Sequence, residues 1–503
     1  MKITISYVTA CLIAIVFCCN VMAAADAVFD KPNVLVIITD EHNFRTLGCY
    51  REQMPREQAE MWGRNVIVPT PNIDAIAHSG VLCTRAYATS PVCSPCRAAM
   101  ITGRYPQATG VPANDEVLDR TIPTLADRLN TAGFRTGFIG KWHLGGTAKP
   151  EWAPKVDGGF QFTKFMFNRG HWKKFVMDGD QPKVGAIQKG KPSYNVDGAD
   201  ETSFSTDFLT DRAIEFMTDA SAGKQPFLTV LSLPDPHGPN TVRAPYDTRF
   251  AKLPFEKPKT FGLGIPAPGW LGAGDKHPAF KGAEMARYFG MVQCIDDNIG
   301  KLVASLTASG QMQNTLVVFT SDHGDLCYEH DRLNKGNPYE GSARVPMILS
   351  YPTQIAAGQV YSEPVGTVDV TPTIIGMLGL PANAEDHGRD LSSILKNVSA
   401  APTTVARQPL TFLRNAGKTA GWVAAVDSRY KLILSVNDEP WLFDKEQDPD
   451  EVLNFWRRPG TKEASVRLGK ALREYGVSKN DPHLKNARIA ESLAEVLSDE
   501  TSN

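Results

Sequence analysis

Four runs of apolar and β-branched residues stand out along the chain, at residues 33–39, 136–139, 226–233 and 315–320. Each run is continuous rather than alternating, which is typical of strands buried on both faces of a parallel sheet. Apolar positions with helical spacing lie between them, over residues 124–130 and about 284–308. This alternation predicts an α/β fold in which a large, mixed but mostly parallel sheet is sandwiched by helices.

The pattern changes after about residue 385. Short apolar segments at residues 411–413, 421–426, 430–435 and 441–443 are joined by close connections, which favours a small antiparallel sheet. A helical pattern follows at residues 465–475. We therefore expect a main domain over residues 30–385 and a small C-terminal antiparallel α+β subdomain over residues 386–503.

The first residues do not read as part of the fold. Lys2 precedes an apolar run over residues 8–17, and residues 21–23 offer a small-residue cleavage site. This arrangement predicts a secretory signal peptide over residues 1–23, and hence export to the periplasm or the medium. The apolar run is too short to span a bilayer comfortably, and we expect no integral membrane segment elsewhere.

Composition sets limits on the function. The 503 residues are 42% hydrophobic and 21% charged, with a formal net charge of −2, which is ordinary for a globular protein. The near-neutral balance gives no reason to expect a nucleic-acid partner. Three of the nine cysteines fall within the predicted leader, and the remainder are too few for disulfides to hold an exported chain of this size together.

Polar side chains directly follow each of the four predicted strands. Taken singly, each is most simply a helix cap or a solvated turn. In an open α/β sheet, however, sites gather at the carboxyl ends of the strands. The residues that this pattern assigns to one candidate site are Asp40, Glu41, Lys141, His143, Asp235, His237, Asp322 and His323.

Cys93 and Cys96 form a C-x-x-C pair that is open to three interpretations. A redox dithiol would need a thioredoxin-like unit of about a hundred residues, and the strand pattern here is much larger. A zinc site would need a second ligand pair, and the sequence contains no other C-x-x-C or H-x3–5-H. In the third interpretation only Cys93 carries chemistry, and Arg97 belongs to its machinery.

The third interpretation is supported by a family resemblance. C-S-P-C-R at residues 93–97, followed by T-G-R at 102–104, resembles the signature of the type I, formylglycine-dependent sulfatases. Other blocks resemble that family in the family's order and extend the resemblance over nearly all of the mature chain, at residues 71–74, 140–145, 236–239, 320–325, 339–346 and 442–451. The resemblance implies an alkaline-phosphatase-like fold and a sulfuric ester hydrolase.

The resemblance also implies roles for individual residues. Cys93 would be oxidised to formylglycine (3-oxoalanine) by a formylglycine-generating maturase and would then be the nucleophile. Arg97 and Lys141 would hold the formylglycine and its charge, and His143 would take the proton that triggers sulfate release. The residues at the leaving oxygen would be His237 and Lys335. One Ca²⁺ ion would be bound by Asp40, Glu41, the formylglycine at position 93, Asp322 and His323.

Two features depart from the family pattern. Many relatives carry Asp, Asn or Gln in place of Glu41 or His323, and an imidazole ligand suits metals softer than Ca²⁺. Cys96 stands where relatives usually have a small residue such as Ser or Ala. Because a Cys93–Cys96 disulfide would block maturation, we expect Cys93 to be converted before, or in competition with, exposure to an oxidising compartment.

An insertion at residues 151–203 is the candidate substrate-binding region. Its aromatic side chains among basic ones suit a sugar ring with further sulfate groups, but they are also typical of a solvated loop with one buried Trp. The candidate residues are Arg169, His171, Trp172 and Lys173. We expect a sulfated oligo- or polysaccharide, with an algal galactan such as carrageenan favoured over aryl sulfates and glycosaminoglycans.

Two other functions stay open on the sequence alone. The chain resembles a superfamily that also contains formylglycine-dependent phosphonate and phosphodiester hydrolases. A non-catalytic protein that binds sulfated glycans is the second alternative, and the complete set of catalytic residues argues against it.

Overall fold

An eight-stranded sheet forms the centre of the molecule, with the strand order β14-β2-β13-β11-β1-β10-β4-β5. The structure is a computed structural model that describes residues 31–271, 278–400 and 410–498. The four predicted strands form the middle of the sheet, as β1 (Asn33–Asp40), β4 (Arg135–Lys141), β10 (Phe227–Pro236) and β11 (Thr315–Ser321). β1 pairs in parallel with both β10 and β11, and β10 pairs in parallel with β4. The predicted large, mostly parallel sheet is confirmed.

Shorter strands complete the sheet and make it mixed. β13 (Met347–Ser350) runs antiparallel to β11 and to β2 (Val81–Cys83). The edge strands are β14 (Gln359–Tyr361) and β5 (Met166–Phe167). Smaller sheets are built from β3 (Ala86–Tyr87), β12 (Arg344–Val345) and β15 (Val365–Gly366), and from the insertion's hairpins β6 (Phe175–Asp178) with β7 (Gln181–Val184) and β8 (Ile187–Gln188) with β9 (Lys191–Pro192).

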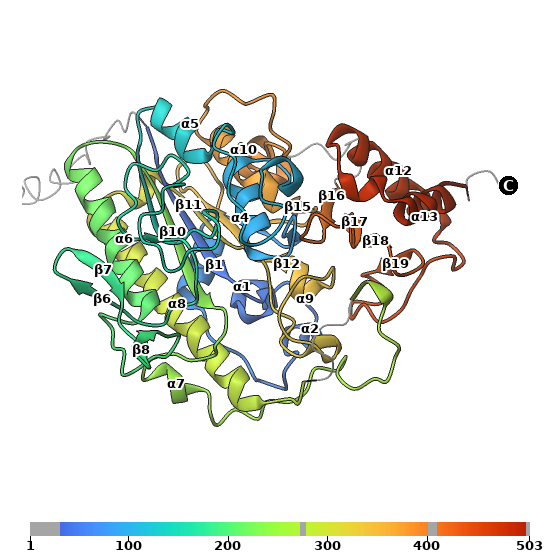
Figure 1. Ribbon diagram of the computed structural model, residues 1–503, viewed down its shortest axis with the longest axis horizontal. Coiled ribbons are helices and arrows are strands. Elements are labelled where there is room, and N and C mark those ends of the chain that lie inside the picture. Colours follow the sequence, from blue (N-terminus) through green and yellow to red (C-terminus); the bar gives the residue numbers. More distant parts are fainter. Residues whose placement is uncertain (1–30, 272–277, 401–409, 499–503) are drawn as a thin grey trace, which may run out of the picture.

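Helices cover both faces of the sheet (Figure 1). Successive side chains of β1 point to opposite faces, and because they are apolar on both, each face needs a covering layer. Val34 and Val36 belong to a core that includes side chains of α4 (Cys93–Thr102), α5 (Leu125–Thr131) and α10 (Val370–Met377). Leu35 and Ile37 belong to a second core, with side chains of α3 (Pro71–His78), α6 (Ser205–Ala222) and α8 (Gly282–Ala308). The short helices are α1 (Gly48–Arg51), α2 (Arg56–Ala59), α7 (Tyr246–Arg249), α9 (Glu340–Ala343) and α11 (Ser392–Lys396).

The C-terminal part forms the predicted antiparallel sheet, at the right in Figure 1. Its strands pair in sequence order, as β16 (Thr411–Arg414), β17 (Trp422–Val426), β18 (Tyr430–Ser435) and β19 (Trp441–Asp444). One face packs on α12 (Lys462–Ser478) and α13 (Ala487–Ser498). The other face packs on Tyr87 and Tyr339 of the main part. The buried Lys431 adds ion pairs of 2.7 Å to Glu340 and Glu451.

None of the helices in the described segments has the combination of length and apolar character that a membrane span requires. The expected signal peptide, residues 1–23, lies outside the described residues.

Candidate active site

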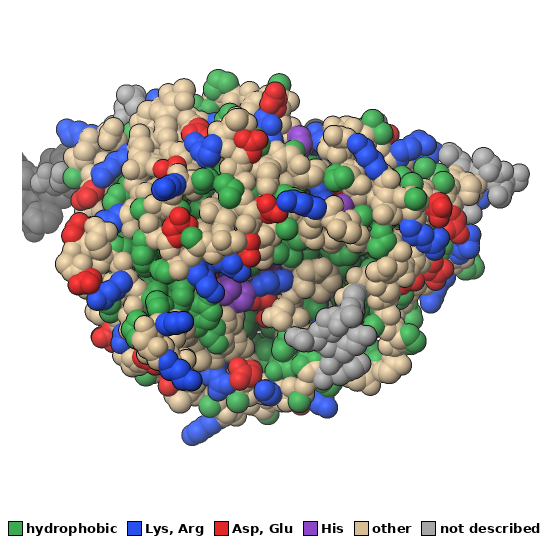
Figure 2. Space-filling view, in the orientation of Figure 1, with side chains coloured by type: hydrophobic (Ala, Val, Ile, Leu, Met, Phe, Trp, Pro, Cys, Tyr) green, Lys and Arg blue, Asp and Glu red, His purple; other side chains and the backbone are tan. Residues whose placement is uncertain are grey.

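The carboxyl ends of the central parallel strands meet at one edge of the sheet and carry most of the predicted site. Asp40 ends β1, Lys141 ends β4, Asp235 lies at the end of β10, and Asp322 follows β11. All four side chains are fully buried. Figure 2 shows histidine and basic side chains gathered in a hollow near the centre of the displayed face.

Helix α4 brings the nucleophile candidate to this edge. It begins at Cys93, directly after the extended Val92, and ends at Thr102. The next residue, Gly103, has a φ of 73°, the left-handed conformation typical of glycine after a helix. Arg97 lies one turn after Cys93 and therefore shares its face of the helix. Cys96 is fully buried elsewhere in the core, where its Sγ lies 3.2 Å from Thr367 Oγ1.

Arg97 links three of the strand ends. Its Nε donates to Asp322 Oδ2 at 2.8 Å and Nη2 donates to Asp40 Oδ2 at 3.1 Å, while Nη1 donates to the Lys141 carbonyl at 2.8 Å. Burial opposes the charge, but Asp322 and Asp40 hold the pKa of Arg97 above its ordinary value. The guanidinium is thus a fixed cation one helical turn from Cys93.

Lys141 supplies a second buried cation. Its Nζ lies 2.5 Å from Asp40 Oδ2 and 2.8 Å from His171 Nε2. Burial alone would raise the pKa of Asp40, but the Lys141 and Arg97 cations hold it well below its ordinary value. Asp40 is therefore an anion despite complete burial.

Four of the five expected metal ligands form one compact group of donor atoms. One donor atom each from Asp40, Cys93, Asp322 and His323 lies within 4.8 Å of the others, and all four residues are buried. Cys93 Sγ is 3.1 Å from His323 Nε2 and 3.7 Å from Asp40 Oδ1. Because His323 Nδ1 donates to the Gly324 carbonyl at 3.0 Å, Nε2 presents its lone pair to the group. Two carboxylates and a free imidazole nitrogen fit a divalent cation.

Glu41, the fifth expected ligand, has other partners in this structure. Its Oε2 is 3.0 Å from His237 Nε2 and its Oε1 is 3.3 Å from Lys335 Nζ. Burial raises the pKa of Glu41 to about 8, although Lys335 acts in the opposite direction. The assignment of Glu41 as a metal ligand stays a prediction.

His237 and Lys335 lie together, as the family resemblance implied. Lys335 Nζ donates to His237 Nε2 at 2.6 Å, and His237 Nδ1 donates to the Gly238 carbonyl at 2.8 Å. The His171 ring stacks on His237 with centroids 3.4 Å apart and an interplanar angle of 9°. Burial and the neighbouring lysines hold the pKa of both imidazoles well below the ordinary value, so both rings are neutral near pH 7.

The four residues of the insertion that were predicted to bind substrate lie in different environments. His171 reaches the catalytic centre, and Arg169 lies at its rim with a side chain that is 33% exposed. Trp172 is packed in the core, and the fully buried Lys173 forms an ion pair of 2.5 Å with Asp235. The expectation that Trp172 and Lys173 face a substrate is wrong, because their side chains fill the interior.

Two residues that the sequence did not indicate also contact the centre. Asp115 Oδ1 lies 3.5 Å from His143 Nε2, and Ser232 Oγ accepts a hydrogen bond of 2.6 Å from Arg97. Ser232 lies within the predicted β10, but a serine in a buried strand carries no signal of its own. Asp115 comes from a loop without periodicity, so its position depends on the tertiary fold.

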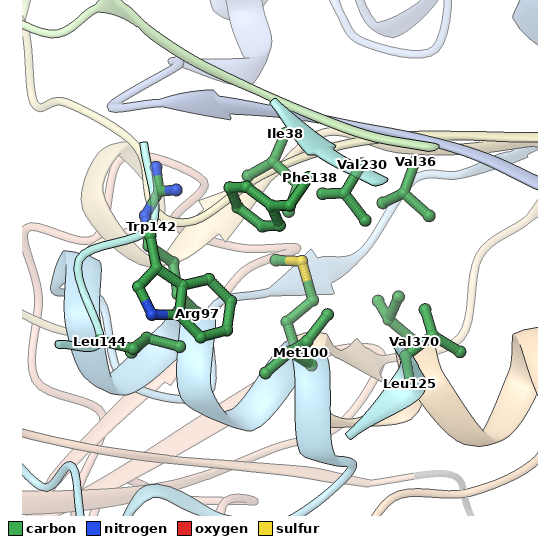
Figure 3. A pocket seen from close by; sticks show the side chains of 11 residues that line it. Val36, Ile38, Arg97, Met100, Leu125, Phe138, Trp142, Leu144, Val230 and Val370 are labelled. Carbon is green, nitrogen blue, oxygen red and sulfur yellow. The ribbon is translucent and has the colours of Figure 1, made fainter. Parts of the chain in front are cut away.

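An apolar cavity of about 20 Å³ lies in the core next to Arg97 (Figure 3). Its wall comes from β1, β4, β10 and helices α4, α5 and α10, through residues such as Ile38, Met100 and Phe138. A buried water needs two to four polar partners, and the Arg97 nitrogens already donate to other groups. The cavity is a small gap in the packing with a mostly apolar wall.

Comparison with known proteins places this geometry in a family. The family model described as Sulfatase matches residues 32–380, more than half of the chain. A second model, described as N-sulphoglucosamine sulphohydrolase, C-terminal, matches residues 328–478.

Individual relatives are distant but cover most of the chain. The ulvan-active sulfatase of Formosa agariphila is 27% identical over 461 residues, covering 89% of this chain and 82% of that protein. A solved protein in complex with its substrate D-glucosamine-2-N,6-O-disulfate has a TM-score of 0.70 at 21% identity, covering 91% of this chain and 99% of that one. The structure of Ps i-CgsB in complex with κ-ι-κ-neocarrahexaose has a TM-score of 0.64 at 23% identity, covering 89% and 93%. The two structures show a shared fold, and the family match shows that this chain belongs to the sulfatases, which are sulfuric ester hydrolases.

Proposed function

We propose that this sulfatase removes sulfate from a sulfated carbohydrate by means of a formylglycine made from Cys93 and a bound Ca²⁺ ion. The observation that carries the proposal is the position of Cys93 at the start of α4, with its Sγ 3.1 Å from His323 Nε2 and 3.7 Å from Asp40 Oδ1. The guanidinium of Arg97 lies beside the same carboxylate.

The electrostatics suit an anionic ester. Arg97, Lys141 and Lys335 are buried or nearly buried cations, and fixed charges of this kind stabilise the negative charge that spreads over the sulfate oxygens as the S–O bond breaks. Asp40, Asp322, His323 and position 93 would hold the Ca²⁺ ion, which would supply further positive charge to the site. Glu41 is proposed as an additional ligand.

The hydrated aldehyde at position 93 supplies one hydroxyl to attack sulfur and a second whose deprotonation releases sulfate and restores the aldehyde. His143 is the residue that takes this proton. His237 and Lys335 lie at the leaving oxygen, where one of them donates a proton to the departing alcohol. Arg97 and Lys141 orient the nucleophile.

The substrate class rests on the relatives and on the rim of the site. The ulvan-active relative and the two ligand-bound structures have sulfated carbohydrates as substrates or bound ligands. Arg169 and His171 are the residues of this chain that we propose to contact the sugar or a further sulfate. A carrageenan-type galactan is the first substrate to test. We also propose export through the leader at residues 1–23, after a maturase has acted on Cys93.

Mass spectrometry of active protein tests the nucleophile. We expect the peptide that contains position 93 to be about 18 Da lighter than its cysteine form, the mass change from thiol to aldehyde. Full activity with an unmodified thiol would contradict the mechanism. A panel of defined sulfated oligosaccharides, assayed beside a phosphodiester, a phosphonate monoester and an aryl sulfate, tests the substrate. Faster turnover of the phosphorus esters would identify the alternative hydrolase, and tight binding without turnover would identify a glycan-binding protein.

A further inference from the structure

A turn at residues 112–118 carries two consecutive polar side chains into the catalytic centre. Asn114 Oδ1 accepts a hydrogen bond of 2.9 Å from the backbone N–H of Ser94, in the first turn of the helix that carries Cys93. Asp115 Oδ1 lies 3.5 Å from His143 Nε2 and 3.0 Å from Arg169 Nη1. The turn thus contacts both the nucleophile helix and the expected base.

The backbone fixes the position of Asp115. Leu118 N–H donates to the Leu144 carbonyl at 3.0 Å, and Gly146 N–H donates to the Glu116 carbonyl at 3.2 Å, so the turn is paired with the segment that follows His143. Gly417, in the connection between β16 and β17, donates its N–H to the Pro112 carbonyl at 2.7 Å. The C-terminal sheet therefore braces the turn from the other side.

Both partners of the His143–Asp115 contact have left-handed backbone conformations. The φ angles are 60° for His143 and 68° for Asp115. A residue other than glycine in this region costs about 1–3 kcal/mol and persists only where the surrounding structure fixes it. The two strained residues face each other at the catalytic centre, which points to a functional contact rather than a chance one.

The two nitrogens of the His143 ring have different surroundings. Nε2 faces a carboxylate, which can only accept, so the ring proton belongs on Nε2. Nδ1 is buried and has no hydrogen-bond partner in the described part of the chain. Burial, Lys141 and Arg97 hold the pKa of His143 well below its ordinary value, so the ring is neutral and its lone pair lies on Nδ1.

We propose that Asp115 is a positioning residue that holds His143 in the tautomer with a free lone pair on Nδ1, while Arg169 Nη1 pairs with the same Oδ1 of Asp115. The inference rests on the proposed function, in which His143 takes the proton of the second hydroxyl at position 93. In that step the O–H proton moves to Nδ1, the C–O bond to sulfate breaks with its electron pair leaving on sulfate, and the C=O bond forms again. Asp115 then stabilises the imidazolium, as a carboxylate does behind a catalytic histidine elsewhere.

The test compares Asp115→Asn with Glu116→Gln as a matched control. The control removes the same charge from the same turn, but Glu116 pairs with the exposed Lys418 and lies outside the centre. The measurement is the ¹⁵N NMR spectrum of the His143 ring, assigned by its loss in His143→Gln. Asp115→Asn removes the negative charge that favours the proton on Nε2, so the tautomer with the proton on Nδ1 becomes populated and the two nitrogen resonances move toward each other. Glu116→Gln should leave them unchanged.

Turnover of 4-nitrophenyl sulfate gives the second measurement. We expect Asp115→Asn to lower kcat by about 10²-fold, the range of a lost general base, while KM changes by less than about twofold and Tm stays near that of the control. Unchanged ring resonances in Asp115→Asn overturn the proposal, whatever happens to kcat. An equal loss of kcat in the control also overturns it.

The same experiment separates this inference from the proposed function. If His143→Gln keeps its activity, the proposed role of His143 is itself wrong. If His143→Gln is inactive while Asp115→Asn resembles the native enzyme in both measurements, only the role of Asp115 fails. The NMR comparison needs no substrate, so it decides the tautomer even where the aryl sulfate is turned over slowly.

Discussion

Replacing Lys173 with methionine separates a structural role from a substrate-binding role at this position. The Lys173 ammonium is fully buried and lies 2.5 Å from Asp235 Oδ1, 2.8 Å from the His237 carbonyl and 3.2 Å from Met291 Sδ. Methionine keeps the length and apolar body of the side chain but removes the charge. Asp235 would then be a buried carboxylate that keeps hydroxyl partners, chiefly Thr206 at 2.5 Å, but has no cationic partner among the described residues.

The expected cost follows from that burial. Removing one partner of a buried ion pair typically costs about 3–5 kcal/mol, because the remaining charge is left without compensation. Unfolding entropy of about 2.1 cal/mol/K per residue gives roughly 1 kcal/mol/K for a chain of this length. We therefore expect Tm to fall by about 3–5 °C. Asp235→Asn in the same chain should recover part of this loss, because it removes the unpaired charge.

Thermal unfolding and steady-state kinetics of the purified variants provide the assay. Lys174→Met is the matched control, since Lys174 is half-buried and its ammonium donates to the Asp197 carbonyl in a solvent-exposed hydrogen bond. Its Tm should change little, as is usual where no buried charge loses its partner. KM of the folded Lys173→Met protein should stay near the native value. A native Tm combined with a strongly raised KM would refute the structural reasoning and restore Lys173 as a substrate contact.

Two further predictions concern the nucleophile and the metal. Cys93→Ala should abolish sulfate release, whereas Cys96→Ser should keep most activity, because serine can still form a hydrogen bond with Thr367; a folded but inactive Cys96→Ser protein would show that the C-x-x-C pair acts as a unit. Ca²⁺ at about 100 times its Kd should stabilise the apo-protein by about 2.7 kcal/mol, and Asp322→Ala should lose both this stabilisation and turnover. Full activity after thorough chelation would contradict the assigned metal site.

The sequence alone predicts the central strands of the sheet but not the short strands beside them. The strands at β1, β10 and β11 are long apolar runs, and their burial on both faces leaves little choice of structure. β2 and β13 have only three and four residues, and an apolar segment of that length fits a strand, a helix end or a loop equally well. Their antiparallel pairing depends on the tertiary fold that brings them together, and a local sequence pattern does not contain this information.

The same distinction applies to the site. Residues at strand ends could be predicted because the sheet brings them to one edge. In the insertion there is no such rule, because a loop has no period that decides which side chain points inward. His171 and Lys173 differ by two positions and both carry nitrogen, yet one stacks on His237 and the other pairs with Asp235 in the interior. Asp115 is the converse case, a site residue that was not predicted, since nothing in its local sequence indicates a contact with His143.

The two acids at the end of β1 show how far neighbouring residues can differ within one site. In a regular strand their side chains would point to opposite faces, but the φ of 66° at Glu41 ends the strand with a turn that keeps both at the catalytic edge. Asp40 lies among Arg97 and Lys141, so its pKa is held well below the ordinary value. Glu41 pairs with the half-buried Lys335, and burial raises its pKa to about 8. Sequence adjacency suggested two equivalent ligands, whereas the distribution of cations makes one a permanent anion and leaves the charge of the other dependent on what binds beside it.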